Sequence, residues 1–193
     1  MGTDPSMDFR AFYEENVALV WRTLFRLGVA KADLPDAVQE VFLVAYRKLP
    51  EFEGRSKIST WLVGISYRVA SDRRDLAHVR REVGEGPELL TQRDHRPDPE
   101  EMAEQRERVA VLDELLAELR PYQREVFVMF ELEELAGKEI AAIVDAPIKT
   151  VFSRLRLARE AFAAAMARRR LSDPSMIRSP STTADQARRG QTP

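Results

Sequence analysis

The sequence has no cysteine and only two histidines, His78 and His95, among its 193 residues. The absence of cysteine excludes disulfides, thiol nucleophiles and cysteine-ligated zinc, and two histidines leave little material for another metal site. Neither histidine stands beside a nucleophile, and the acidic residues from Glu82 to Glu107 are spread along the chain rather than clustered. We therefore expect no metal, no cofactor and no enzymatic activity.

Long apolar runs are also missing. No stretch approaches the roughly 20 apolar residues of a membrane span, and the first seven residues lack the apolar core of a signal peptide. The sequence thus predicts a cytoplasmic protein without membrane insertion, with residues 1–7 as a leader outside the fold. A hydrophobic content of 44% still suffices for one ordinary core or two small ones.

Charge of one sign is not in excess, because 30 Lys and Arg face 32 Asp and Glu, for a net charge of -2. A uniformly basic nucleic-acid binder would have a clear positive excess. Any anion-binding surface must therefore be local.

Helical periodicity runs through most of the chain and no strand pattern occurs, so we expect an all-α fold. Apolar residues three or four apart predict helices over 9–27, 33–50 and 59–76, with Gly28 as a stop, Asp33 as one cap, and Ser59 or Thr60 as another. Further helices are predicted over 98–119, with Asp98 as the cap, and over 121–130, 138–144 and 148–170.

Two segments interrupt this pattern. Glycine, proline and acidic residues accumulate over 83–97, which predicts a flexible linker. Residues 172–193 are rich in Ser, Thr, Pro and Arg and predict a disordered tail. The expected organisation is two small helical domains, 8–82 and 98–171.

Residues 138–161 have helix-turn-helix spacing: a short helix, a turn that ends in Pro147, and a longer helix. The longer helix has one apolar stripe, made of Val151, Leu155, Ala158 and Phe162. The side opposite displays Lys149, Thr150, Ser153, Arg154 and Arg156, which can read a major groove, since arginine offers two hydrogen bonds to guanine. The alternative is an ordinary helical hairpin with a solvated basic face.

Aromatic and basic residues are interleaved over 52–81. Phe52, Trp61 and Tyr67 alternate with Arg55, Lys57, Arg68, Arg73, Arg74, Arg80 and Arg81. Such a mixture suits single-stranded nucleic acid, because bases stack on rings while cations follow the phosphates. The alternative is that Trp61 simply packs inside a helical domain.

The outer face of the helix predicted over 33–50 is a mixed stripe with an apolar centre. It consists of Asp36, Gln39, Glu40, Leu43 and Arg47. Such a stripe can be a docking surface for the helices of another protein. An ordinary solvent-exposed helix face has the same pattern.

In this order, the segments resemble the extracytoplasmic function (ECF) group of bacterial RNA polymerase sigma factors, which keep only regions two and four of the sigma-70 family. The resemblance covers about residues 9–170. The residues that carry it are DAVQEVF at 36–42, FEG at 52–54, STWL at 59–62, RPYQREV at 120–126, EIA at 139–141, TVFSRL at 150–155 and AREA at 158–161. Each of these motifs alone is weak evidence for the resemblance, but the set in this order is highly specific.

The resemblance implies that the stripe of Asp36, Gln39, Glu40, Leu43 and Arg47 docks on core RNA polymerase. It implies that the unpaired strand of the minus-ten promoter element is held by Phe52, Lys57, Ser59, Thr60, Trp61, Tyr67, Arg68, Arg73 and Arg74. It assigns the minus-thirty-five element to Lys149, Thr150, Phe152, Ser153, Arg154 and Arg156. Core polymerase, promoter DNA and a cognate anti-sigma factor are the expected partners. The alternative is a two-domain helix-turn-helix regulator that acts without polymerase.

Four positions depart from the usual family pattern. Arg68 stands where asparagine is common, Phe152 where a basic residue is common, and Leu157 where arginine is common. Asp145 replaces the glycine of the helix-turn-helix turn, and aspartate visits left-handed backbone conformations more readily than most residues. Phe152 can touch a thymine methyl or pack against a partner. We therefore expect a promoter preference that differs from that of better-known members.

Overall fold

The computed structural model describes residues 9–82 and 101–172, and every regular element within these ranges is helical, which confirms the all-α expectation. The N-terminal module (residues 9–82) contains α1 (Phe9–Arg26), η1 (Lys31–Asp33), α2 (Leu34–Lys48), η2 (Leu49–Glu51) and α3 (Ile58–Glu82). The C-terminal module (residues 101–172) contains α4 (Glu101–Ala117), α5 (Pro121–Phe127), the π-helical turn η3 (Val128–Leu132), α6 (Gly137–Ile143) and α7 (Ile148–Ser172). The predicted leader, linker, Asp98 cap and tail beyond Ser172 lie outside the described residues.

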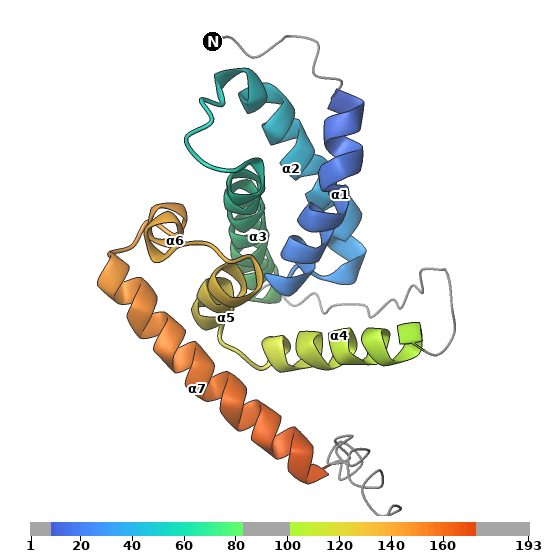
Figure 1. Cartoon of the computed structure of the whole chain (residues 1–193), viewed down its shortest axis with the longest axis vertical. Helices are drawn as coiled ribbons and strands as arrows, with labels where there is room; N and C mark the ends of the chain where they lie inside the picture. Colours follow the sequence, from blue (N-terminus) through green and yellow to red (C-terminus); the bar gives the residue numbers. More distant parts are fainter. Residues whose placement is uncertain (1–8, 83–100, 173–193) are drawn as a thin grey trace, which may run out of the picture.

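The N-terminal module is three helices packed around one apolar core (Figure 1). The buried side chains that meet there include Phe12, Val20 and Leu24 of α1, Val38, Val41 and Ala45 of α2, and Leu62, Ile65 and Val69 of α3. Their spacing of three and four residues places each set on one side of its helix. The opposite sides of the three helices are left for solvent or partners.

The ends of these helices agree only partly with the sequence expectations. Gly28 ends the first helical segment as predicted: its φ is +98°, and its N–H donates to the Phe25 carbonyl at 3.0 Å. Asp33 is at the N-cap of α2, but its side chain makes no capping hydrogen bond. The prediction of Ser59 or Thr60 as a cap is wrong, because α3 begins at Ile58 and the Trp61 N–H already donates to the Lys57 carbonyl.

The C-terminal module ends in the predicted helix-turn-helix. α6 starts where the Glu139 carboxylate accepts the Ala136 N–H at 2.8 Å, which is half of a capping box. The turn after α6 passes through Asp145 at φ +48°, so this aspartate does adopt the left-handed conformation. Pro147 comes directly before α7, and its carbonyl accepts the Thr150 N–H at 2.8 Å.

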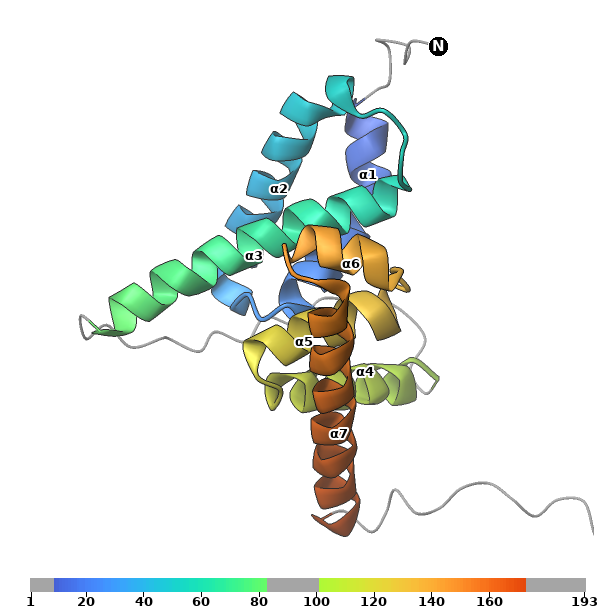
Figure 2. The same ribbon diagram turned by 90° about the vertical axis from the view of Figure 1, so that its left-hand side faces the viewer.

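The two modules lie directly against one another. α5 and α6 lie beside α3, and α4 runs beneath the end of α1, as the two views show (Figures 1 and 2). Leu116, Phe127 and Ala158 belong to the same buried cluster as the core of the N-terminal module. Conversely, Val63 of α3 is buried among C-terminal side chains. Within the described ranges, no helix is long and apolar enough to cross a membrane.

Candidate nucleic-acid interface

The first turns of α7 present a basic face. Lys149, Ser153 and Arg156 are exposed, and Thr150 is half-buried. On the other side, Val151, Leu155 and Ala158 are fully buried, while Phe162 is partly buried against the core. The predicted division of this helix into a buried stripe and a displayed side is confirmed. A displayed side of this kind fits a major groove.

The arginines of this face are held in different ways. The half-buried Arg154 guanidinium lies 5.8 Å from the centre of the Tyr122 ring, a cation–π contact that orients the side chain. Arg156 donates to Glu160 at 2.6 Å on the exposed surface of the same helix. Arg154 is therefore preordered, whereas Arg156 must exchange a carboxylate for any other partner.

Phe152 rests on α6 with about half of its surface exposed. Its ring lies edge-on to Phe130 at 6.3 Å and so close to Gly137 that a Cβ there would lie 2.8 Å from Cζ of Phe152. The absence of a side chain at Gly137 thus lets the phenyl ring lie against the first turn of α6. The remaining exposed part of the ring is available to a base or a partner.

The loop between η2 and α3 carries the aromatic residues of the second predicted surface. Phe52 and Trp61 lie with their ring centres 5.1 Å apart, and both are half-buried. Lys57 and Ser59 of the same segment are exposed, as is Arg68 further along α3, and Thr60 is half-buried. Trp61 also packs against the core, as the alternative interpretation predicts, and part of the residue remains exposed.

The next residues of α3 that were assigned to DNA are engaged with protein instead. Arg73 donates to the Glu40 carboxylate of α2 at 3.0 Å. Arg74 pairs with Glu125 of α5 at 2.5 Å, and the Glu125 side chain is only 6% exposed. Tyr67 is half-buried on the same side of α3 as Arg74. In this arrangement these three residues are not displayed together with Trp61.

The outer face of α2 is open. Asp36, Gln39, Leu43 and Arg47 are exposed, and Glu40 is half-buried beside Arg73. A shallow groove adjoins this face, lined among others by Phe9, Tyr13, Phe42, Leu43 and Tyr46. Tyr13 and Tyr46 belong to none of the sites predicted from the sequence, although both are exposed aromatics and Tyr46 follows Leu43 by nearly one turn.

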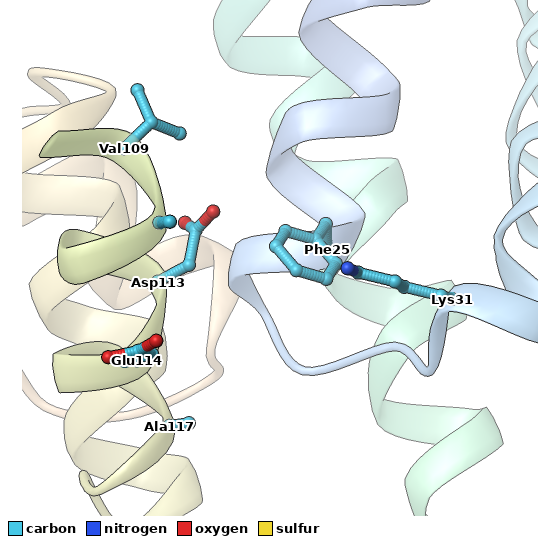
Figure 3. Close-up of a pocket in the computed structure, with 7 residues that line it drawn as sticks. Phe25, Lys31, Val109, Asp113, Glu114 and Ala117 are labelled. Atoms are coloured by element: carbon cyan, nitrogen blue, oxygen red, sulfur yellow. The ribbon is translucent and has the colours of Figure 1, made fainter. Parts of the chain in front are cut away.

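Buried ionisable groups gather where the modules meet. Burial raises the pKa of the Tyr67 hydroxyl and the nearby Glu125 raises it further, against the opposing effects of Arg74 and Arg154. Burial also raises the pKa of Glu133, whose carboxylate accepts the Thr23 hydroxyl at 3.3 Å and lies 3.7 Å from Arg22. Burial likewise raises the pKa of Asp113, which faces Phe25 and Lys31 across an open pocket (Figure 3). Keeping the Glu133 and Asp113 carboxylates charged in these buried positions therefore costs free energy.

The carboxylates of the described ranges are not gathered for metal binding, since no three His, Asp or Glu side chains there are placed to hold an ion. What the surfaces offer is cations, aromatic rings and exposed apolar side chains. Such groups bind nucleic acid and protein.

Comparison with known proteins fits this geometry. The family model for sigma-70 region 2 matches residues 12–81, and that for sigma-70 region 4 matches residues 110–162. The ECF RNA polymerase sigma-E factor of Escherichia coli K12 is 36% identical over 159 residues, which cover 77% of this chain and 80% of that protein. This chain is an ECF sigma factor of the sigma-70 family.

A second relative of the sigma factor is the probable RNA polymerase sigma-C factor of Mycobacterium bovis, 33% identical over 160 residues and 80% of each chain. Two solved structures share its fold. The sigma factor RpoE of Bartonella quintana, in complex with the anti-sigma factor NepR, matches with a TM-score of 0.64 at 20% identity over 83% of this chain and 97% of that one. CnrH, in complex with the cytosolic domain of CnrY, matches with a TM-score of 0.56 at 22% identity over 82% and 87%.

Proposed function

We propose that this sigma factor joins core RNA polymerase through α2, holds the unpaired minus-ten strand with the loop and first turns of α3, and reads the minus-thirty-five element with α7. One observation carries the proposal: the modules that match regions two and four have three exposed faces of different chemistry. These are the mixed face of α2, the aromatic loop and first turns of α3, and the basic face of α7. On this proposal the protein acts in the cytoplasm as a non-enzymatic initiation factor, whose role is to bind polymerase and promoter DNA.

The free energy of opening promoter DNA requires a contribution from the polymerase. Opening about ten base pairs costs about 14 kcal/mol if each step is worth about 1.4 kcal/mol. Two or three bases stacked on side chains such as Trp61 return only about 2 to 9 kcal/mol. The free protein therefore does not melt DNA, and the channel of the core enzyme must supply the remaining contacts.

Run-off transcription tests the proposed function. Purified sigma factor and core polymerase are incubated with sheared genomic DNA, and the 5′ ends of the transcripts are sequenced. Starts that depend on the added protein and share two upstream elements support the proposal. The alternative, a helix-turn-helix regulator without polymerase docking, predicts binding of the free protein to a duplex site and no protein-dependent starts.

Replacement of Arg154 with alanine tests the role of α7. The expected result is a loss of holoenzyme affinity for the upstream element of about 1 to 3 kcal/mol, or about 5- to 150-fold, if the guanidinium makes a bidentate contact with guanine. Electrophoretic mobility shifts with wild-type and scrambled upstream elements measure it. Arg170→Ala is the matched control, because Arg170 is exposed on the same helix beyond the region 4 match. Unchanged discrimination between the two elements in the Arg154 variant contradicts the assignment.

A protein inhibitor is the remaining partner. The Bartonella quintana relative in the fold was solved with the anti-sigma factor NepR, and we infer that this sigma factor also has a cognate anti-sigma factor. The exposed apolar groove beside α2 is one surface on which such a protein can compete with polymerase.

A further inference from the structure

The Phe152 ring, near the start of α7, is held from two sides. α6 packs against α7 (Figure 2) and brings its first residue, Gly137, against the ring. A Cβ on Gly137 would lie 2.8 Å from Cζ and 3.2 Å from Cε2 of Phe152, so the ring occupies the space that a side chain would fill. The Phe130 ring meets it edge-on, with the ring centres 6.3 Å apart. A side chain held in this way loses little conformational freedom when it binds a ligand.

Phe130 is itself fixed in place. It packs against the buried cluster that contains Ile140, and the Arg159 guanidinium lies 5.4 Å from its ring centre. Arg159 in turn donates to the Glu131 carboxylate at 2.7 Å. All of these residues belong to the C-terminal module, so the position of Phe152 does not depend on how the two modules are placed.

The exposed 48% of Phe152 lies among cations. Lys149, three residues before it, and Arg156, four residues after it, lie on the same side of the helix, and both are exposed. An apolar protein surface laid over the ring would take these cations out of water without partners, which costs free energy.

DNA fits the same group of side chains better. The two cations can pair with phosphates, and the ring then lies toward the edges of the bases. Thymine presents a methyl group in the major groove, and an apolar side chain such as phenylalanine recognises thymine through this methyl. The position of the ring beside two cations therefore favours a base over a protein partner.

We propose that Phe152 makes this sigma factor selective for one thymine of the minus-thirty-five element, by packing its ring against the 5-methyl group, and that Gly137 is the positioning residue that keeps the ring in place. This inference rests on the proposed function, which assigns α7 to that element. It adds the base and the chemical group that are recognised at a position where the family commonly has a basic residue.

Replacement of thymine with uracil tests the proposal, because uracil lacks the 5-methyl group and keeps the O4 acceptor. Fragments carry the upstream element of a promoter found by run-off transcription, and each thymine of either strand is replaced singly with deoxyuridine. Competition for holoenzyme at low temperature measures closed-complex affinity. One replacement should weaken binding about threefold to fivefold, the effect of one buried methyl group, and the others should have no effect.

Variants of the protein assign the effect to the ring. Holoenzyme with Phe152→Ala should bind the thymine and uracil fragments equally at the sensitive position. Gly137→Ala should also lose most of the distinction, because the new methyl group displaces the ring. Gly137 does not have a left-handed backbone, so alanine is compatible with the fold, and thermal unfolding of both variants verifies this. Leu157→Ala is the matched control: it removes another exposed apolar side chain of α7 and should keep the full distinction.

The outcomes separate this inference from the proposed function. An element in which no thymine is sensitive to uracil overturns the inference, and so does a Phe152→Ala variant that still distinguishes thymine from uracil. A Phe152→Ala variant that assembles poorly with core polymerase, on any DNA, shows instead that the ring contacts protein. Full distinction in Gly137→Ala removes the positioning role. In each case the proposed function stands as long as wild-type holoenzyme prefers the element to a scrambled one, whereas loss of that preference counts against the proposed function itself.

Discussion

Replacement of Trp61 with alanine should leave closed promoter complexes nearly intact and lower the open-complex fraction by about 5- to 150-fold. The range corresponds to one stacked base, worth about 1 to 3 kcal/mol. Trp61 lies half-buried beside Phe52 at the start of α3, where its ring can stack on an unpaired base. Such stacking begins only after the strands separate. Duplex binding before that step depends on α7. Permanganate reactivity of unpaired thymines measures opening, and mobility shifts at low temperature measure closed-complex binding.

The control for this variant is the other tryptophan. Trp21 is 43% exposed on α1 and belongs to none of the three surfaces, so Trp21→Ala should change neither measurement. Trp61 also packs against the core, and thermal unfolding of the variant must therefore be followed in parallel. Trp61→Phe keeps an aromatic face and should recover part of the opening. Equal losses of closed and open complexes would show that Trp61 acts before strand separation or only through the fold.

Burial along each helix could be predicted because it follows from local periodicity. In α7, the spacing of Val151, Leu155 and Ala158 places them on one side of any α-helix, and this side must face the module whatever its partner. The left-handed Asp145 is another local property, since the turn between two helices needs one residue in that conformation. The helices, the helix-turn-helix and the displayed faces were accessible from sequence for this reason.

The exact helix starts, and the contacts between residues far apart in the sequence, could not be predicted from local periodicity. The first turn of α3 begins at Ile58 through the Lys57 carbonyl, so the neighbouring Ser59 and Thr60 do not act as caps. The partner of Arg74 depends on how two modules joined by a long connection pack against each other, and no local pattern encodes this. Arginine spacing therefore predicted a cationic surface, whereas the structure places Arg73 and Arg74 on carboxylates.

Replacement of Leu43 with aspartate should weaken binding to core polymerase by more than a hundredfold. Leu43 is 49% exposed on α2, beside the groove that Tyr13 and Tyr46 also line, so the change does not disturb the core. If this face docks on polymerase, the new carboxylate is buried without a partner, at a cost of about 3 kcal/mol or more. Competition with labelled wild type for core enzyme measures the loss.

Dependence on protein concentration separates this variant from the one at Trp61. A docking defect is overcome at high concentration, because the holoenzyme that does form still has intact DNA-reading surfaces, so run-off from the Leu43 variant should approach wild type when the sigma factor saturates core. The Trp61 defect should persist at saturation, since it lies in a step after assembly. Leu171→Asp is the matched control, because Leu171 is 85% exposed near the end of α7, outside the region 4 match. A Leu43 variant that competes as well as this control would remove the exposed face of α2 from the docking surface.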